Sequence, residues 1–193
     1  GFHAANQADA QVGESAAVLG SGCIGLSTLM ALQARGVTEV YMVDLIDLRL
    51  EKANEVGAAE ILNAKEVDVV EEVMKLTDGK GVDMVIETAG SKVTAKQSVE
   101  LIKRGGRIVL VGMAADPVFE FDFGKLQAKE AFINTVFRYR NIYPKAIKAV
   151  GDGLIDIKEV VTDTFGFSEI QDAFEYNIAN KDKTVKIVID MNK

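Results

Sequence analysis

Three closely spaced glycines, Gly20, Gly22 and Gly25, constrain the fold of this chain more than any other feature. Residues 16–19 before them are small or apolar and predict a buried strand. The residues after them predict a helix that ends at Gly36. A strand that passes through glycines directly into a helix is typical of a parallel α/β sheet.

The same glycine spacing indicates a binding turn for a dinucleotide. Gly20 permits a tight turn, Gly22 lets the backbone approach a pyrophosphate, and Gly25 lets the helix pack close to the strand. The free N–H groups at the start of the helix would face the phosphates. Ordinary loops reach this spacing by chance, so the hypothesis depends on the strand before the motif and the helix after it.

An acidic residue, Asp44, stands at the end of the next predicted strand, residues 40–43. It lies about 20 residues after the glycines, where a carboxylate can accept hydrogen bonds from the adenosine ribose hydroxyls. A carboxylate there would repel a 2′-phosphate, which favours NAD over NADP. The alternative is an ordinary loop that carries a solvated aspartate.

Strands and helices continue to alternate, which predicts a doubly wound parallel sheet, the Rossmann fold, with strand order 3-2-1-4-5-6. Asp47 is expected to cap a helix over 48–56. Ligands in such sheets bind beyond the carboxyl ends of the strands, where Thr88, Gly90, Val111, Gly112 and Met113 also fall. The six predicted strands are 16–19, 40–43, 61–62, 82–87, 107–112 and 131–137, and the later helices are 67–76 and 91–104.

The pattern divides the chain into a nucleotide-binding domain, residues 1–140 with a lead-in segment at 1–14, and a C-terminal segment, 141–193. The C-terminal segment predicts a short α+β extension, because its strands have no place in a six-stranded sheet. Its predicted elements are a helix from Pro144 to Val150, a strand at 160–165, a helix capped by Ser168 that runs to Ile178 with Ile170, Ala173, Phe174 and Ile178 inward, and a strand at 184–189.

Composition argues against several classes of function. The net charge of −7 leaves no basic stripe for nucleic acid. Cys23 is the only cysteine and His3 the only histidine, so the chain alone cannot assemble a His/Cys metal site. His3 is a candidate acid or base by residue type only, with a structural or solvated histidine as the alternative. We see no membrane span and no secretory signal, and a cytoplasmic location is expected.

Several stretches resemble the zinc-dependent medium-chain dehydrogenase/reductase family, and most closely its sorbitol (L-iditol) dehydrogenase branch. The glycine motif is shared by many dehydrogenases, whereas the Phe-Arg-Tyr-x-Asn-x-Tyr-Pro pattern is more particular to polyol dehydrogenases. The resemblance covers essentially the whole chain. It is carried by residues 1–4, 18–25, 43–44 with 49–50, 87–90, 105–112 and 137–144.

The resemblance implies roles for individual residues. Asp44 would bind the adenosine ribose, and Arg49 would lie beside the adenine. Arg138 and Tyr139 would donate hydrogen bonds to the hydroxyls of a polyol substrate. The residues implied in cofactor binding are Gly20, Gly22, Cys23, Ile24, Gly25, Asp44, Arg49, Thr88, Gly90, Val111, Gly112, Met113, Val136, Phe137 and Arg138.

The family carries its catalytic zinc ligands in an N-terminal domain, ahead of the stretch that matches Gly1–Ala4. The chain therefore resembles an NAD-binding domain with a C-terminal tail, without catalytic residues or zinc of its own. We expect it to bind NAD without turning over, and to form a homo-oligomer through the edge of its sixth strand. The alternatives are a related alcohol, butanediol or threonine dehydrogenase, or a non-catalytic NAD-sensing module.

Overall fold

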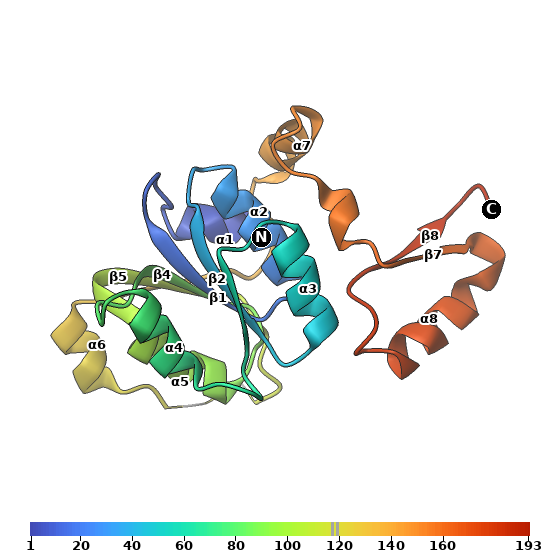
Figure 1. Ribbon diagram of the computed structural model, residues 1–193. Helices are drawn as coiled ribbons and strands as arrows, with labels where there is room; N and C mark the ends of the chain where they lie inside the picture. The colour runs from blue at the N-terminus through green and yellow to red at the C-terminus, as the bar shows by residue number, and fades with distance from the viewer. Residues whose placement is uncertain (117, 119) are drawn as a thin grey trace.

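A six-stranded parallel sheet forms the centre of the computed structural model, which describes residues 1–116, 118 and 120–193. The strand order is β3-β2-β1-β4-β5-β6 (Figure 1), which confirms the predicted doubly wound fold. The register places Ala17 of β1 between Tyr41 of β2 and Val85 of β4. The strands are β1 (Ser15–Leu19), β2 (Glu39–Asp44), β3 (Glu60–Asn63), β4 (Val82–Glu87), β5 (Ile102–Leu110) and β6 (Phe132–Thr135).

Helices cover both faces of this sheet. All five residues of β1 are buried, and alternate residues serve different cores: Ala16 and Val18 join one cluster, Ala17 and Leu19 the other. Burial on both faces explains why the strand is a continuous apolar run. The first cluster includes residues of α1 (Phe2–Gln7), α2 (Cys23–Gln33) and α3 (Asp47–Glu55), and the second those of α4 (Val69–Leu76), α5 (Lys92–Leu101) and α6 (Phe123–Lys129).

Two of these helices were not predicted from the sequence. The lead-in segment contains α1, whose Ala4 and Ala5 are fully buried in the first core cluster. A region expected to be loose contains α6, which begins after the capping residue Asp122. The sequence predicts a looser stretch containing Pro117 before the sixth strand, and Pro117 itself lies outside the described residues. In the described part of the chain, no helix is long and apolar enough to pass through a bilayer.

Strand β5 begins earlier than predicted, directly after α5. Gly105 has a φ of +70° and lies inside the strand, not before it. The register with β4 changes there, because Val82 pairs with Ile102 whereas Met84 pairs with Arg107. The predicted helix end at residue 104 and strand start at 107 were therefore wrong, since this bulge keeps both glycines within the strand.

Two predicted helix caps were also wrong. Ile46, not Asp47, is the N-cap of α3, and Asp47 instead accepts a hydrogen bond of 2.6 Å from the Asn63 side chain. Ser168 lies inside a short 3-10 turn, Phe167–Glu169, ahead of the last helix. The Glu169 carboxylate accepts the Gly166 N–H at 2.8 Å, so Glu169 rather than Ser168 caps the start of this turn.

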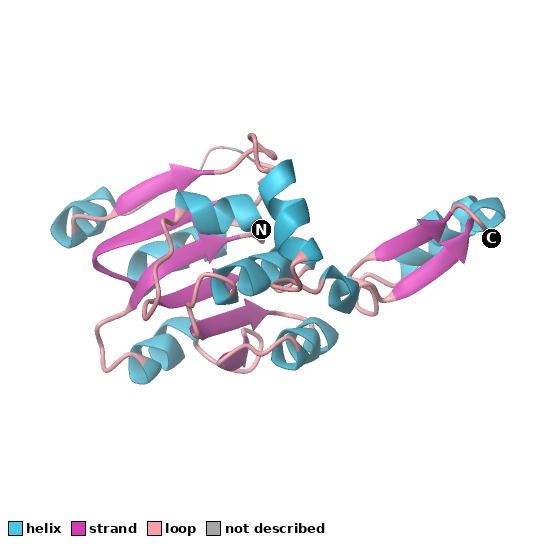
Figure 2. Cartoon of the chain, turned by 90° about the horizontal axis from the view of Figure 1, so that it is seen from above, coloured by secondary structure: helices cyan, strands magenta, loops and turns pink. Residues whose placement is uncertain are grey.

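Residues 141–193 contribute no strand to the six-stranded sheet. Strands β7 (Asp163–Gly166) and β8 (Ile187–Asp190) pair with each other in a separate parallel sheet, next to α8 (Ile170–Ala179). Figure 2 shows this unit beyond the carboxyl ends of the central strands. Helix α7 (Tyr143–Gly151) and the 3-10 turn Ile157–Val160 connect it to the sheet, and Ala149, Ile155 and Val160 join the first core cluster.

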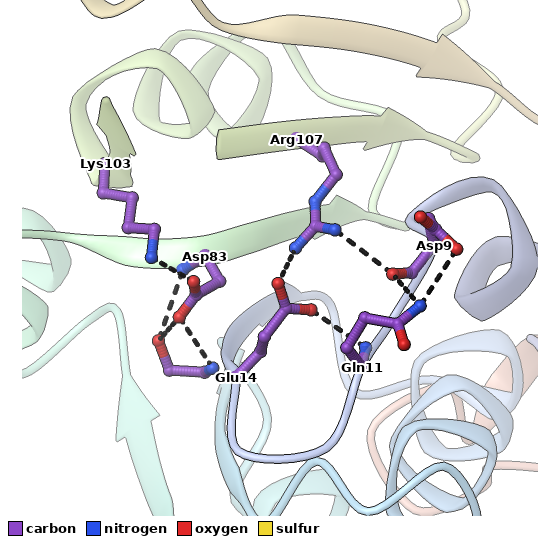
Figure 3. Close-up of polar contacts among 7 residues, drawn as sticks. Asp9, Gln11, Glu14, Asp83, Lys103 and Arg107 are labelled. Carbon is purple, nitrogen blue, oxygen red and sulfur yellow. Dashed lines mark hydrogen bonds and ion pairs between the residues drawn. The ribbon is translucent and has the colours of Figure 1, made fainter. Parts of the chain in front are cut away.

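Salt bridges link residues near the amino ends of β4 and β5, on the side of the sheet opposite the carboxyl ends of the strands (Figure 3). The Arg107 guanidinium contacts Glu14 and donates to the Asp9 carbonyl at 3.1 Å, which ties the lead-in segment to β5. Asp83 pairs with Lys103 and accepts the Ser15 N–H at 3.0 Å. Burial acts to raise the pKa of Asp83, but the hydrogen bonds from Lys103 and Ser15 outweigh it and hold the pKa below its ordinary value.

Candidate functional site

A cleft of about 690 Å³ opens at the carboxyl ends of β1, β2 and β4. Its position agrees with the general rule that ligands of open α/β sheets bind where the strand order reverses. Among the predicted site residues, the cleft brings together Gly20, Gly22, Cys23, Ile24, Gly25, Asp44, Arg49 and Thr88, and its other lining residues are Val43, Leu45, Ile46, Ala64, Ala89, Ser91, Val93, Thr94 and Gln97.

The floor of the cleft is a turn in which Gly20 and Gly25 leave no room for a side chain. Gly20 has a φ of +103°, and its N–H donates to the Val43 carbonyl at 2.8 Å. A Cβ on Gly25 would lie 1.9 Å from the Gly20 carbonyl oxygen. The Thr88 hydroxyl donates to the carbonyls of Gly20, at 2.9 Å, and Leu19, at 3.1 Å. The glycines therefore hold β1, α2 and the end of β4 in direct backbone contact.

The N-terminus of α2 faces open space. Gly22 is the N-cap residue and provides no capping side chain. A Cβ built on Gly22 would meet no heavy atom within 4 Å, in contrast to Gly20 and Gly25. The first N–H groups of a helix have no partner within the helix, and they carry its positive dipole end. This combination of free donors and open space fits a phosphate group.

Asp44 lies beside the turn and accepts hydrogen bonds from backbone N–H groups. Its Oδ2 accepts the Ser21 N–H at 2.7 Å, and its Oδ1 accepts the N–H groups of Leu45, at 2.7 Å, and Ile46, at 3.1 Å. The side chain is 8% exposed, so these bonds fix the carboxylate at the wall of the cleft. Each carboxylate oxygen can accept more than one hydrogen bond, and Asp44 retains capacity for a ligand hydroxyl.

Arg49 connects the cleft to the C-terminal unit. Its Nη1 lies 3.9 Å from Asp44 Oδ2, and its Nη2 donates to the Lys181 carbonyl at 3.1 Å. Its Nε is buried and has no hydrogen-bond partner among the described residues. The side chain therefore lines the cleft next to Asp44.

Another group of predicted residues lies beside the cleft, at the ends of β4, β5 and β6. Gly90 contacts Met113, because a Cβ on Gly90 would lie 2.6 Å from the Met113 carbonyl oxygen. Val136 donates its N–H to the Leu110 carbonyl at 2.9 Å. The cleft lining does not include Gly90, Val111, Gly112, Met113, Val136, Phe137, Arg138 or Tyr139.

The predicted substrate residues are exposed. The Arg138 guanidinium lies 4.9 Å from the Phe137 ring centroid, and the Tyr139 ring lies 5.1 Å from that of Tyr143. The structure thus groups these side chains after β6 without enclosing them. His3 lies in α1, outside the cleft lining; burial and the positive charges of Arg140 and the chain terminus lower its pKa.

Sequence reasoning missed two polar residues at the site. Ser21 is fully buried and supplies the N–H that holds Asp44. Glu87 is 2% exposed and accepts the Gly90 N–H at 2.8 Å. A signal for Glu87 exists in the sequence, because it is an acidic residue at the carboxyl end of a strand whose preceding three residues are apolar. Across the described residues, no three His, Cys, Asp or Glu side chains form a group suited to a metal ion.

Comparisons with known proteins identify the family. The family model described as "zinc-binding dehydrogenase" matches residues 23–152. The chain is 40% identical over 192 residues to an uncharacterized zinc-type alcohol dehydrogenase-like protein, YdjJ, of Escherichia coli (strain K12). It is 34% identical over 193 residues to a sorbitol dehydrogenase of Bacillus subtilis (strain 168). Each alignment covers 100% of this chain and 55% of the relative.

Solved structures agree with the sequence relatives. An alcohol dehydrogenase from Escherichia coli CFT073, crystallised with NADH, superimposes with a TM-score of 0.87 at 28% identity, over 96% of this chain and 56% of that one. The chain thus spans about half the length of the proteins it matches. The matched family model covers most of the chain, and the strand order is that of a dinucleotide-binding sheet. The chain therefore belongs to the zinc-binding dehydrogenase family, a medium-chain family of oxidoreductases.

Proposed function

We propose that this chain is the NAD-binding domain of a zinc-dependent polyol dehydrogenase. The observation that carries the proposal is the contrast among the three glycines: Gly20 and Gly25 are needed by the fold, whereas the space beside Gly22 is open. That open space lies at the first N–H groups of α2, where a pyrophosphate would be bound. The likeness to sorbitol dehydrogenase supports a polyol as the substrate of the whole enzyme.

In this proposal the Asp44 side of the cleft binds the adenosine half of the cofactor. Asp44, fixed by Ser21, accepts hydrogen bonds from the ribose hydroxyls, and Arg49 lies beside the adenine. The nicotinamide half extends toward 111–113 and 136–138, where the sheet has its second group of loops. Arg138 and Tyr139 then contact the substrate hydroxyls with their exposed donors.

Zinc would not be held by this chain in the proposal. The described residues contain no group of His, Cys, Asp or Glu side chains suited to a metal ion. The relatives extend well beyond the matched region, and we place the zinc ligands in that remainder. Nicotinamide, when bound, supplies the hydride acceptor. Residues 1–193 bind and orient the nicotinamide, so we expect NAD binding without polyol oxidation.

Asp44→Ala tests the cofactor assignment. We expect the Kd for NAD to rise about tenfold, since an interaction with the ribose hydroxyls is worth on the order of 1.4 kcal/mol. The preference for NAD over NADP should fall as well, because the repulsion of a 2′-phosphate is removed. Titration calorimetry with both cofactors measures these changes.

A matched control is Asp47→Ala, which removes an exposed carboxylate three residues farther along the chain and outside the cleft lining. Its NAD and NADP affinities should equal those of the unmodified chain. An unchanged cofactor preference in Asp44→Ala would contradict the ribose role of Asp44. Failure of the unmodified chain to bind either cofactor would contradict the proposed function as a whole.

The free edge of β6 carries the proposal of a homodimer. Phe132 is 62% exposed and Ile133 40% exposed, and β6 pairs only with β5 in the described sheet. An unpaired apolar edge strand favours pairing with a second copy of the same strand. We expect a dimer in sedimentation velocity at micromolar concentration, weakened at least tenfold by Phe132→Glu. A monomer at every concentration would reject the proposal.

A further inference from the structure

Glu87, the last residue of β4, is the most deeply buried carboxylate beside the cleft. It is 2% exposed and belongs to none of the roles proposed so far. A carboxylate is costly to bury, and it persists in a folded protein where hydrogen bonds hold it. The partners of Glu87 therefore indicate what the residue does.

The side chain of Glu87 holds the loop that follows β4. Its Oε1 accepts the Gly90 N–H at 2.8 Å and the Thr94 hydroxyl at 2.7 Å. Thr94 is itself tied to Ser91, the N-cap residue of α5, whose side chain accepts the Thr94 N–H at 3.1 Å. One carboxylate oxygen thus fixes the loop 88–90 to the first turn of α5.

The same residue holds the loop that follows β5. The Glu87 carbonyl accepts the N–H groups of Val111, at 2.8 Å, and Gly112, at 3.0 Å. A Cβ on Gly112 would lie 2.7 Å from Glu87 Oε2 and 2.2 Å from the Gly90 nitrogen. The two loops therefore touch at Gly90 and Gly112 with no room for a side chain, and Glu87 lies where they meet.

The position of the contact between Gly90 and Gly112 in the sheet indicates which half of the cofactor lies beside it. A doubly wound sheet consists of two mononucleotide-binding halves, β1–β3 and β4–β6, on either side of the switch point. Asp44, at the end of β2, assigns the adenosine to the first half. The loops at 88–90 and 111–113 follow β4 and β5, so they belong to the half that would receive the nicotinamide.

We propose that Glu87 is a positioning residue for the nicotinamide half of the site: by holding Gly90 and Thr94, its carboxylate fixes the 88–90 loop, which packs against Gly112 of the 111–112 turn and with it forms the backbone against which the nicotinamide binds. The inference rests on the proposed function, because it assumes that NAD occupies the cleft. Glu87 acts through the two loops and does not itself contact the reacting atoms.

The test compares NAD with ADP-ribose, which lacks the nicotinamide ring. Titration calorimetry on the 193-residue chain gives both Kd values for the unmodified protein, Glu87→Ala and the isosteric Glu87→Gln. We expect Glu87→Ala to weaken NAD about tenfold and Glu87→Gln about threefold, with ADP-ribose affinity changed less than twofold in both. Thr94→Val, which removes one hydrogen-bond partner of Glu87 Oε1, should likewise raise the ratio of the NAD Kd to the ADP-ribose Kd. Should Glu87→Ala fail to fold, Glu87→Gln and Thr94→Val still give the ratio.

Asp83→Asn is the matched control, because Asp83 is a hydrogen-bonded carboxylate on the same strand but at its opposite end. It should lower the melting temperature and leave the ratio of the two Kd values unchanged. Equal weakening of NAD and ADP-ribose by the Glu87 variants, or no weakening, would overturn the inference. So would an unmodified chain that binds both ligands equally, which leaves the proposed function intact. A chain that binds neither ligand would instead reject the proposed function.

Discussion

Replacing Gly25 with alanine is expected to lower the free energy of unfolding by about 3 kcal/mol and to weaken NAD binding more than a hundredfold. The new Cβ would lie 1.9 Å from the Gly20 carbonyl oxygen and 2.9 Å from its carbonyl carbon. Both are backbone atoms of the turn, so no side-chain rotation relieves the clash. Helix α2 must move away from β1, which displaces the N–H groups proposed to bind the pyrophosphate. Thermal unfolding and calorimetric titration with NAD measure the two effects.

Gly22→Ala tests NAD binding without disturbing the fold. Gly22 has φ −70° and ψ −173°, an extended conformation that alanine adopts freely, and its Cβ would meet no protein atom within 4 Å. We expect a normal melting temperature but NAD binding weakened at least tenfold, because the methyl group occupies the space proposed for the pyrophosphate. Unchanged NAD binding in Gly22→Ala would contradict that placement, and unchanged stability in Gly25→Ala would contradict the close backbone contact.

The sequence was sufficient to predict the central sheet because the signals that specify it are local. The central strands β1, β2 and β4 are buried on both faces, so each is a short, mainly apolar run, and turn residues bound it. The glycine motif specifies a backbone geometry within a few residues, and the structure shows that geometry at Gly20 and Gly25. Asp44 was found in the same way, since it ends a strand that follows the motif at a fixed distance.

The errors arose where a distant residue determines the local structure. The end of α5 and the bulge at Gly105 depend on contacts between β4 and β5, which propensity does not report. Glu87 looked like an ordinary polar residue at a strand end, and only its bonds to Gly90 and Thr94 distinguish it. Contacts of this kind form between loops and leave no periodic pattern in the sequence.

Helix α8 shows a different limit of sequence reasoning. Four of its residues were predicted to face inward, yet only Ala173 is buried, whereas Phe174 is 63% exposed and Ile178 66% exposed. Periodicity identifies the apolar face of a helix but not the element that covers it. The predicted burial of Phe174, Ile170 and Ile178 was wrong for this chain, because the described residues cover Ala173 but leave most of that face exposed.

Lys129→Met is expected to lower the free energy of unfolding by about 3 kcal/mol. The Lys129 ammonium donates to the carbonyls of Val99 at 2.8 Å, Glu100 at 2.7 Å and Ile102 at 2.7 Å. Helix α5 passes directly into β5, so it lacks a terminal turn in which these carbonyls could be satisfied. Burial lowers the pKa of Lys129, which agrees with an ammonium enclosed by the protein. Methionine keeps the apolar length and removes all three donors.

Lys125→Met is the matched control for this prediction, since Lys125 lies on the same helix and its loss changes the net charge equally. Its exposed ammonium pairs with the Glu100 side chain, and such surface pairs contribute less than about 1 kcal/mol. For a chain of this size, the loss at Lys129 corresponds to a fall of about 9 °C in the melting temperature, against about 3 °C or less for Lys125. NAD affinity should be unchanged in both variants, because neither residue lines the cleft. Equal melting temperatures for the two variants would contradict the stabilising role of the three Lys129 hydrogen bonds.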